Sequence, residues 1–376
     1  MDLEHEPDAV IRAGRRDDLL ALLAIRLGFH PSESLLLGCV EGPRSRLGFV
    51  ARVDLPEQAH MHQQVAALAE VFRAQAAERV VVVAVGRGVG LDAIVDETVQ
   101  ALTAVDVDVV EALVADGKHW WCRLCPAGTC GDARGTPYDL TSSPALAQAV
   151  LAGVSVLPSR TALADNFAAA PGQRRDDVTA AVDDVRASLR RHWRRHGGER
   201  PLHRTPAVLA TGAARVRRLL EQATQEGAPE AYGALLGAHL SSGPIAELAV
   251  LADMAPVRDV AWSLITRASA RDHAALWAQV ARHAPVELSA APLALAGFAS
   301  WLHGDGAAAW CAVERCLREH PDYSMGLLLA EALHRALPPD RWSPPPQALV
   351  DAGLHPPAVA DHPPRSDRPA DDRPEQ

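Results

Sequence analysis

The segment Arg79-Val-Val-Val-Val-Ala-Val85 decides the fold class of this 376-residue chain. Its apolar residues do not alternate with polar ones, and that pattern is typical of a strand buried on both faces by helices. A glycine-rich turn, Gly86-Arg-Gly-Val-Gly90, follows directly, and a helix is expected from Leu91 to Ala104. A buried strand, a turn and a helix in this order predict an α/β layer architecture.

The residues before this segment extend the same architecture. Asp17 or Asp18 is expected to cap a helix that Gly28 ends, because Asp accepts from helix N-terminal amides and Gly adopts the left-handed conformation. The turn-forming residues Glu41-Gly-Pro-Arg-Ser45 indicate that the strands on either side of them pair antiparallel. The elements expected here are helix 17–27, strand 34–40, strand 47–55 and a helix opened by Pro56 that continues to about residue 77.

Two further strands are expected after the central helix. Val107 to Ala115 is apolar enough for a strand, and Asp116-Gly117 is a tight-turn signal that lets His119 to Leu124 return beside it. Strands that alternate with helices and also form hairpins predict a mixed sheet. The N-terminal domain is therefore predicted to be an α/β domain with a mixed sheet over residues 17–170, after a flexible stretch at 1–16.

Strand signals stop after Asp177, and glycine and proline punctuate the remaining apolar segments at short intervals. This pattern predicts an all-α domain of helical hairpins over residues 171–337. The expected helices are 178–196, 207–226, 229–240, 245–251, 257–269, 272–283, 292–303, 306–319 and 324–337. From Pro338 to Gln376, 11 of 39 residues are proline, so a disordered Pro-rich tail is expected there.

Composition excludes several classes of protein. The formal net charge of −10 argues against a protein that coats nucleic acid. Lys118 is the only lysine, so the abundance of arginine reflects general residue usage and carries little weight as a phosphate-binding signal. No apolar run approaches the roughly 20 residues of a membrane-spanning helix, and the first 18 residues carry no apolar signal core, so a cytoplasmic protein without membrane contact is expected.

The most conspicuous motif is His119-Trp-Trp-Cys122-Arg-Leu-Cys125-Pro-Ala-Gly-Thr-Cys130. Three cysteines and a histidine at these spacings could supply four zinc ligands. Cys125 and Cys130 could instead pair as a redox-active or structural disulfide, or all the thiols could be free. Because no second Cys-x-x-Cys pair exists, we expect no metal site, with Cys125 and Cys130 as weak candidates only, and far less than one zinc per purified chain.

A second motif is the glycine-rich turn after the central strand. A turn of this kind between a strand and a helix can hold phosphate on its backbone N–H groups. The glycines of Gly86-Arg-Gly88-Val-Gly90 do not have the spacing of a dinucleotide fingerprint, and no phosphate-binding Lys follows. A permissive turn is the simpler interpretation, and no cofactor is expected.

Four residues are candidates for a polar or catalytic cluster: His30, Arg52, Asp54 and Arg160. Arg52 and Asp54 share one face of a strand, and Asp54 lies near its end, where open α/β sheets bind ligands. His30 lies in the loop before the neighbouring strand, and Arg160 leaves the α/β domain and can fold back over the sheet edge. We expect these groups to form a buried or half-buried cluster, in which loss of Asp54 would cost on the order of 3 kcal/mol by leaving an arginine unpaired.

Several segments together resemble an actinobacterial family of uncharacterised proteins, domain-of-unknown-function family 4192. They are Leu27-Gly-Phe-His-Pro-Ser-Glu-Ser34-Leu, Ala51-Arg-Val-Asp-Leu-Pro56, Gly135-Thr-Pro, Val156-Leu-Pro-Ser-Arg160, Ala299-Ser-Trp-Leu-His-Gly304-Asp-Gly-Ala and His320-Pro-Asp-Tyr-Ser-Met325. The resemblance spans roughly residues 17 to 339 and implies an actinobacterial cytoplasmic protein, but it brings no activity, substrate or cofactor. It also implies that Cys125 and Cys130 occupy family positions whereas Cys122 is incidental.

The residues Gly297, Ala309, Val313, Cys316 and Pro321 occupy positions that tetratricopeptide repeats use for close helix packing. One such pair indicates tetratricopeptide-like hairpins in part of the helical domain, and such hairpins usually bind proteins. The favoured function is therefore a non-catalytic protein-interaction or regulatory role with a protein partner at the helical domain. The alternative is an enzyme or small-ligand-binding protein with a site on the loops of the α/β domain, around His30, Asp54, 86–90 and 116–130.

Overall fold

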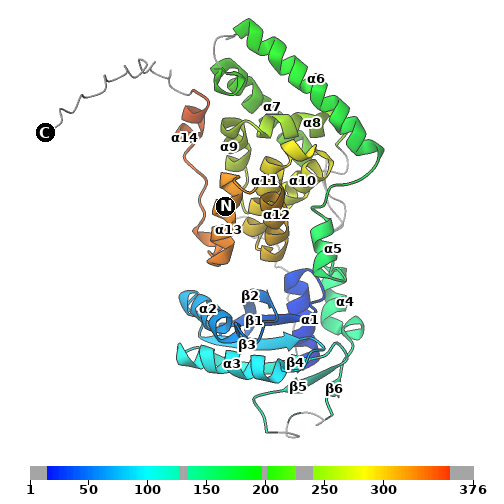
Figure 1. Cartoon of the computed structure of the whole chain (residues 1–376), viewed down its shortest axis with the longest axis vertical. Helices are drawn as coiled ribbons and strands as arrows, with labels where there is room; N and C mark the ends of the chain where they lie inside the picture. Colours follow the sequence, from blue (N-terminus) through cyan, green and yellow to red (C-terminus); the bar gives the residue numbers. More distant parts are fainter. Residues whose placement is uncertain (1–14, 127–129, 131–133, 197–200, 226–239, 356–376) are drawn as a thin grey trace, which may run out of the picture.

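The structure is a computed structural model that describes residues 15–126, 130, 134–196, 201–225 and 240–355. A layered sheet lies at one end of the molecule and a group of packed helices at the other (Figure 1). The predicted fold class, an α/β region with a mixed sheet followed by a helical region, is confirmed. Within the described residues, no helix has both the length and the apolar content to cross a bilayer.

The described strands form one six-stranded sheet of order β2-β1-β3-β4-β5-β6. Only β3 and β4 are parallel, and the other neighbours are antiparallel. The two hairpin signals predicted the antiparallel pairs β1–β2 and β4–β5. The strands are β1 (Ser34–Glu41), β2 (Arg46–Asp54), β3 (Arg79–Val85), β4 (Asp108–Ala115), β5 (His119–Cys122) and β6 (Thr136–Pro137).

Strand β3 is central and buried on both faces. Val80, Val82 and Ala84 contribute to one hydrophobic core, beneath the helices α2 (Met61–Ala74) and α3 (Leu91–Ala104). Val83 and Val85 point to the other core, with Leu23 and Leu27 of α1 (Arg16–Leu27). The unbroken valine run is explained by this arrangement, because successive side chains of a strand enter opposite layers.

The other helices of the α/β region are the short α4 (Pro144–Leu151) and α5 (Arg160–Asp165), which the sequence analysis did not predict. Helix α2 begins at Met61 and not at Pro56, because residues 57–60 form a turn. Asp18 caps α1 from its third position: its carboxylate accepts from the Arg15 backbone N–H at 3.1 Å.

The helical region follows the predicted order. Its helices are α6 (Gln173–His196), α7 (Pro206–Gln225), α8 (Ser242–Ala252), α9 (Ala255–Ser263), α10 (Ala270–His283), α11 (Ala290–His303), α12 (Gly306–Glu319) and α13 (Ser324–His334). The helix expected at 229–240 lies outside the described residues except for its last residue. Helix α9 ends at Ser263, six residues before the predicted end, because a turn follows it.

Helices α11 and α12 approach each other closely at a glycine. A Cβ added to Gly297 would lie 3.2 Å from a Val313 methyl carbon and 3.3 Å from the Ala309 carbonyl oxygen. Small residues therefore set the distance between these two helices, as their spacing in the sequence suggested.

The expectation of a disordered tail from Pro338 is wrong for residues 338–355. The Trp342 ring packs against Trp262 and Phe298, with ring centroids 4.7 Å and 5.0 Å away. Beyond it, α14 (Gln347–Gly353) buries Val350, and Leu354 is buried just after the helix. Proline content misled the prediction because a few apolar side chains suffice to hold an extended segment against a preformed core. The remaining residues of the tail lie outside the described part of the chain.

Candidate functional site

A pocket of about 550 Å³ lies at the edge of the sheet where the parallel strands β3 and β4 end. One wall is the glycine-rich turn 86–90 together with the start of α3, and the facing wall is β5 with the loop that follows it. The parallel pairing brings these segments together, because the carboxyl ends of β3 and β4 meet at one edge. The pocket therefore joins the two motifs that stood out in the sequence.

The glycine-rich turn has a defined geometry. Gly86 N–H donates to the Ala115 carbonyl at 2.9 Å, and Arg87 N–H donates to the Glu33 carboxylate at 3.0 Å. Gly90 has a φ of 96°, in the left-handed region that favours glycine, and directly precedes α3. These contacts fix the turn as one rim of the pocket.

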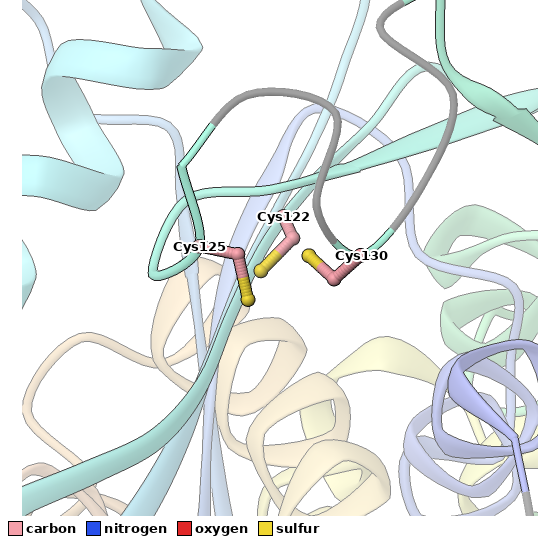
Figure 2. Close-up of side chains that lie close together, drawn as sticks. All are labelled: Cys122, Cys125 and Cys130. Carbon is pink, nitrogen blue, oxygen red and sulfur yellow. The ribbon is translucent and has the colours of Figure 1, made fainter.

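Three cysteine side chains meet in the opposite wall (Figure 2). Cys122 ends β5, Cys125 lies three residues later, and the Cys130 side chain lies beside them. Their Sγ atoms all lie within 4.8 Å of one another. The three side chains are half-buried, and none of them is in a disulfide bond. Among the described residues this is the one group of three or more potential metal-ligating side chains within that distance.

The ion pair between Arg16 and Glu111 contacts the cysteine cluster. Arg16 of α1 donates from Nε to the Glu111 carboxylate at 2.9 Å and from Nη1 to the Cys130 carbonyl at 3.1 Å. The Cys122 thiol donates to the other Glu111 oxygen at 3.6 Å. The Arg16 guanidinium also lies over the Trp120 ring, 5.2 Å from its centroid, which ties α1 to β5.

Cys125 and Cys130 differ in acidity. Hydrogen bonds from Cys130 and Cys122 lower the pKa of Cys125, with the positive charge of Arg16 adding to the effect. The same hydrogen bond to Cys125 raises the pKa of Cys130 to about 12. Cys125 is therefore the first of this pair to become a thiolate, and its negative charge opposes ionisation of Cys130.

The polar cluster predicted from the sequence lies elsewhere, at the junction between the sheet and the helical region. Arg52 contacts the Asp54 carboxylate at 2.5 Å and donates to the Ser34 hydroxyl at 2.9 Å. Arg160 instead pairs with Glu314 of α12 at 2.7 Å, although the charge of Asp54 still acts on it and helps to raise the pKa of Arg160. Burial, the largest influence on Arg160, acts in the opposite direction.

Two details of that prediction are wrong. The Asp54 side chain is 85% exposed, so it is not a buried partner of an arginine. His30 donates its backbone N–H to the Leu157 carbonyl at 2.9 Å, and within the described residues no hydrogen bond or ion pair of its imidazole is found. Strand spacing placed Arg52 and Asp54 together, but it could not show that the strand end projects into solvent.

Sequence reasoning missed Arg16 and Glu111 as neighbours of the cysteines. Arg16 lay in a segment expected to be flexible, and Glu111 lay within an otherwise apolar strand. The position of Glu111 in a predicted strand beside the cysteine-bearing strand was the available signal. The strand register explains why Glu111 lies near the cysteines. Leu113 lies opposite Cys122, and Glu111, two residues before Leu113, is on the same face of β4.

The fold and the pocket define a class: a mixed-sheet α/β region joined to a helical array, with a thiol-lined pocket at the sheet edge. The model of one protein family, described as a domain of unknown function (DUF4192), matches residues 17–340. The chain belongs to this family. No curated protein and no solved structure matches the chain.

Proposed function

We propose that the protein binds a small molecule in the pocket between the glycine-rich turn and the cysteine loop. The observation that carries the proposal is the pocket itself, because its volume of about 550 Å³ is in the range of small-molecule sites. Its position at the carboxyl ends of two parallel strands is also where open α/β sheets bind ligands.

The walls of the pocket combine apolar and polar groups. Trp121 offers aromatic surface, and the three thiols also line the pocket. Arg123 also lines the pocket and is held by Asp96 at 2.7 Å and Asp92 at 3.4 Å. These groups favour a polar ligand with an apolar or planar part, since fixed charges orient one end while the ring covers the other.

A cytoplasmic location fits this proposal. The reducing conditions of the cytoplasm keep thiols free, and the pocket presents three of them.

A pocket-filling variant tests the proposal. Gly88 lines the pocket, its φ is outside the left-handed region, and an added Cβ meets no atom within 4 Å. Gly88→Leu should therefore fold normally while occupying part of the pocket. Gly243→Leu is the matched control, because Gly243 is equally open but lies in α8.

The measurement is the melting temperature of each protein against a library of metabolites. We expect a compound that raises the melting temperature of the wild type and of Gly243→Leu but not that of Gly88→Leu. Equal stabilisation of all three proteins would place the ligand elsewhere and contradict the proposal.

A protein partner at the helical region is a second candidate function, and it rests on one observation. Leu327 and Leu328 of α13 are 48% and 73% exposed. Adjacent exposed leucines near the end of a helical array favour a protein contact. Leu328→Glu should abolish capture of a partner, whereas Leu349→Glu, at a leucine of α14 that is 67% exposed, should not.

A further inference from the structure

The cysteine cluster supports an inference about metal binding, which goes beyond the proposed binding of a small molecule. We propose that Cys122, Cys125 and Cys130 bind one thiophilic metal ion through three thiolates, with Zn²⁺ the best match, and that a fourth coordination position faces the pocket.

The distances between the sulfur atoms fit such a site. A zinc–sulfur distance of about 2.3 Å and tetrahedral angles place coordinating sulfurs about 3.8 Å apart. The three Sγ atoms lie within 4.8 Å of one another, so each pair has to close by about 1 Å at most. Cys122 lies in β5, and Cys125 and Cys130 follow it outside any helix or strand.

Binding by three thiolates brings three negative charges together. The nearest positive group, the Arg16 guanidinium, is already neutralised by Glu111 at 2.9 Å. Arg123 is likewise paired with two aspartates. Zinc binding would release the thiol protons to solvent, and the bound ion would carry the compensating positive charge.

The surrounding contacts resemble those that orient metal ligands. Arg16 holds the Cys130 backbone through its carbonyl oxygen at 3.1 Å, and its Nη2 lies 3.9 Å from the Cys122 sulfur, a contact that a thiolate can keep. Glu111 in turn holds the Arg16 guanidinium at 2.9 Å. Groups of this kind orient ligating side chains in metal sites. Arg16 and Glu111 are therefore positioning residues for the cluster.

The fourth position follows from the donor set. All three cysteines line the pocket, and within the described residues no other His, Cys, Asp or Glu joins their group. A zinc ion with three protein ligands keeps one position for water or an added ligand. This last step rests on the proposed small-molecule pocket, whereas binding by the three thiolates does not.

The sequence interpretation expected no metal because the chain has no second Cys-x-x-Cys pair and because the family resemblance implies that Cys122 is incidental. The structure brings Cys122 into the group, and this is the reason for the revision. Cys122 packs against one hydrophobic core, but neither core contains Cys125 or Cys130, so folding is still expected to proceed without the ion.

The test is metal binding by the full-length protein, reduced and stripped with a chelator. Zn²⁺ alone should bind with one equivalent per chain, measured in competition with a chromophoric chelator. Co²⁺ should give thiolate charge-transfer bands together with the strong visible bands of a tetrahedral site. Absence of stoichiometric Zn²⁺ binding, or Co²⁺ bands without a thiolate contribution, would overturn the proposal.

Cysteine variants locate the site. Cys122→Ser, Cys125→Ser and Cys130→Ser should each weaken Zn²⁺ binding by on the order of 100-fold, because each removes one thiolate. Cys39→Ser is the matched control and should bind like the wild type, since Cys39 is buried in β1. Circular dichroism checks that each variant folds, and the wild-type Co²⁺ spectrum decides the case without any variant. Unchanged affinity in the triple variant would overturn the proposal.

Imidazole added to the Co²⁺ protein tests the open position. The visible bands of the wild type and of Gly243→Leu should shift, and those of Gly88→Leu should not. Unchanged bands in all three proteins would overturn the open position. A protein that binds the metal but no metabolite would contradict only the proposed function. A protein that binds a metabolite but no metal would contradict only the metal site.

Discussion

The six cysteines fall into two groups of three that differ in surroundings. Cys39, Cys311 and Cys316 are buried in the hydrophobic cores, and burial raises the pKa of Cys39 and Cys316 to about 12 and that of Cys311 to about 11. Cys122, Cys125 and Cys130 are half-buried, close together and beside a pocket. The number of cysteines therefore says little about their role, because a buried thiol acts as a small apolar side chain and a clustered thiol can act as a ligand or nucleophile.

The largest expected difference between the two groups is in reaction with iodoacetamide. A rise in pKa from 9 to about 11, as at Cys311, lowers the thiolate fraction about 100-fold, and burial lowers access further. In the metal-free protein at pH 8, Cys125 should be alkylated at least about 100-fold faster than the buried three. Peptide mass spectrometry over time checks this, and equal rates for Cys125 and Cys311 would break the comparison.

A buried histidine extends the comparison from thiols to imidazoles. His273 of α10 is 4% exposed, and desolvation lowers its pKa from 6.5 to about 4. The unfolded chain binds the proton more tightly, so stability is complete above about pH 6.5 and is lost as the pH falls toward 4. The loss at pH 4 is about 3 kcal/mol.

Urea unfolding at a series of pH values measures this loss. His273→Leu should flatten the curve between pH 6.5 and 4. His62→Gln should leave it unchanged, because the His62 side chain is 89% exposed. An unchanged slope in His273→Leu would show that other groups cause the acid sensitivity.

Serine substitutions in the two groups of cysteines should also differ in their effect on the free energy of unfolding. Cys39→Ser puts a hydroxyl into the core under α2 and should cost about 1 to 3 kcal/mol in the free energy of unfolding. Cys125→Ser changes a half-buried loop residue and should alter it by less than about 0.5 kcal/mol. Urea unfolding of the metal-free proteins compares them, and a larger cost at Cys125 would make the loop a structural element.

A smaller cost than that of Cys39→Ser is expected from Asp54→Ala at the junction between the two regions. Asp54 is 85% exposed, so Asp54→Ala should cost no more than about 1 kcal/mol, well below the cost of a buried pair. Arg52→Ala should cost more, because the Arg52 side chain is only 15% exposed and also bonds Ser34. Equal costs in thermal unfolding would show that the ion pair alone matters there.

The features that were predicted correctly from the sequence are those that local sequence patterns control. The valine run of β3, the turn at 116–117 and the spacing of small residues in α11 and α12 each depend on neighbours in the chain, and the structure agrees with them. The sequence could not predict how buried each group is, because burial depends on segments far apart. Asp54 and Cys122 show this: one projects into solvent, and the other meets two cysteines and Glu111.

The most direct test of the central claim is the zinc X-ray absorption spectrum of the full-length protein loaded with one equivalent of Zn²⁺. Binding at Cys122, Cys125 and Cys130 predicts three sulfur neighbours at about 2.3 Å and one lighter neighbour. A spectrum with only nitrogen and oxygen neighbours at about 2.0 to 2.2 Å would contradict it.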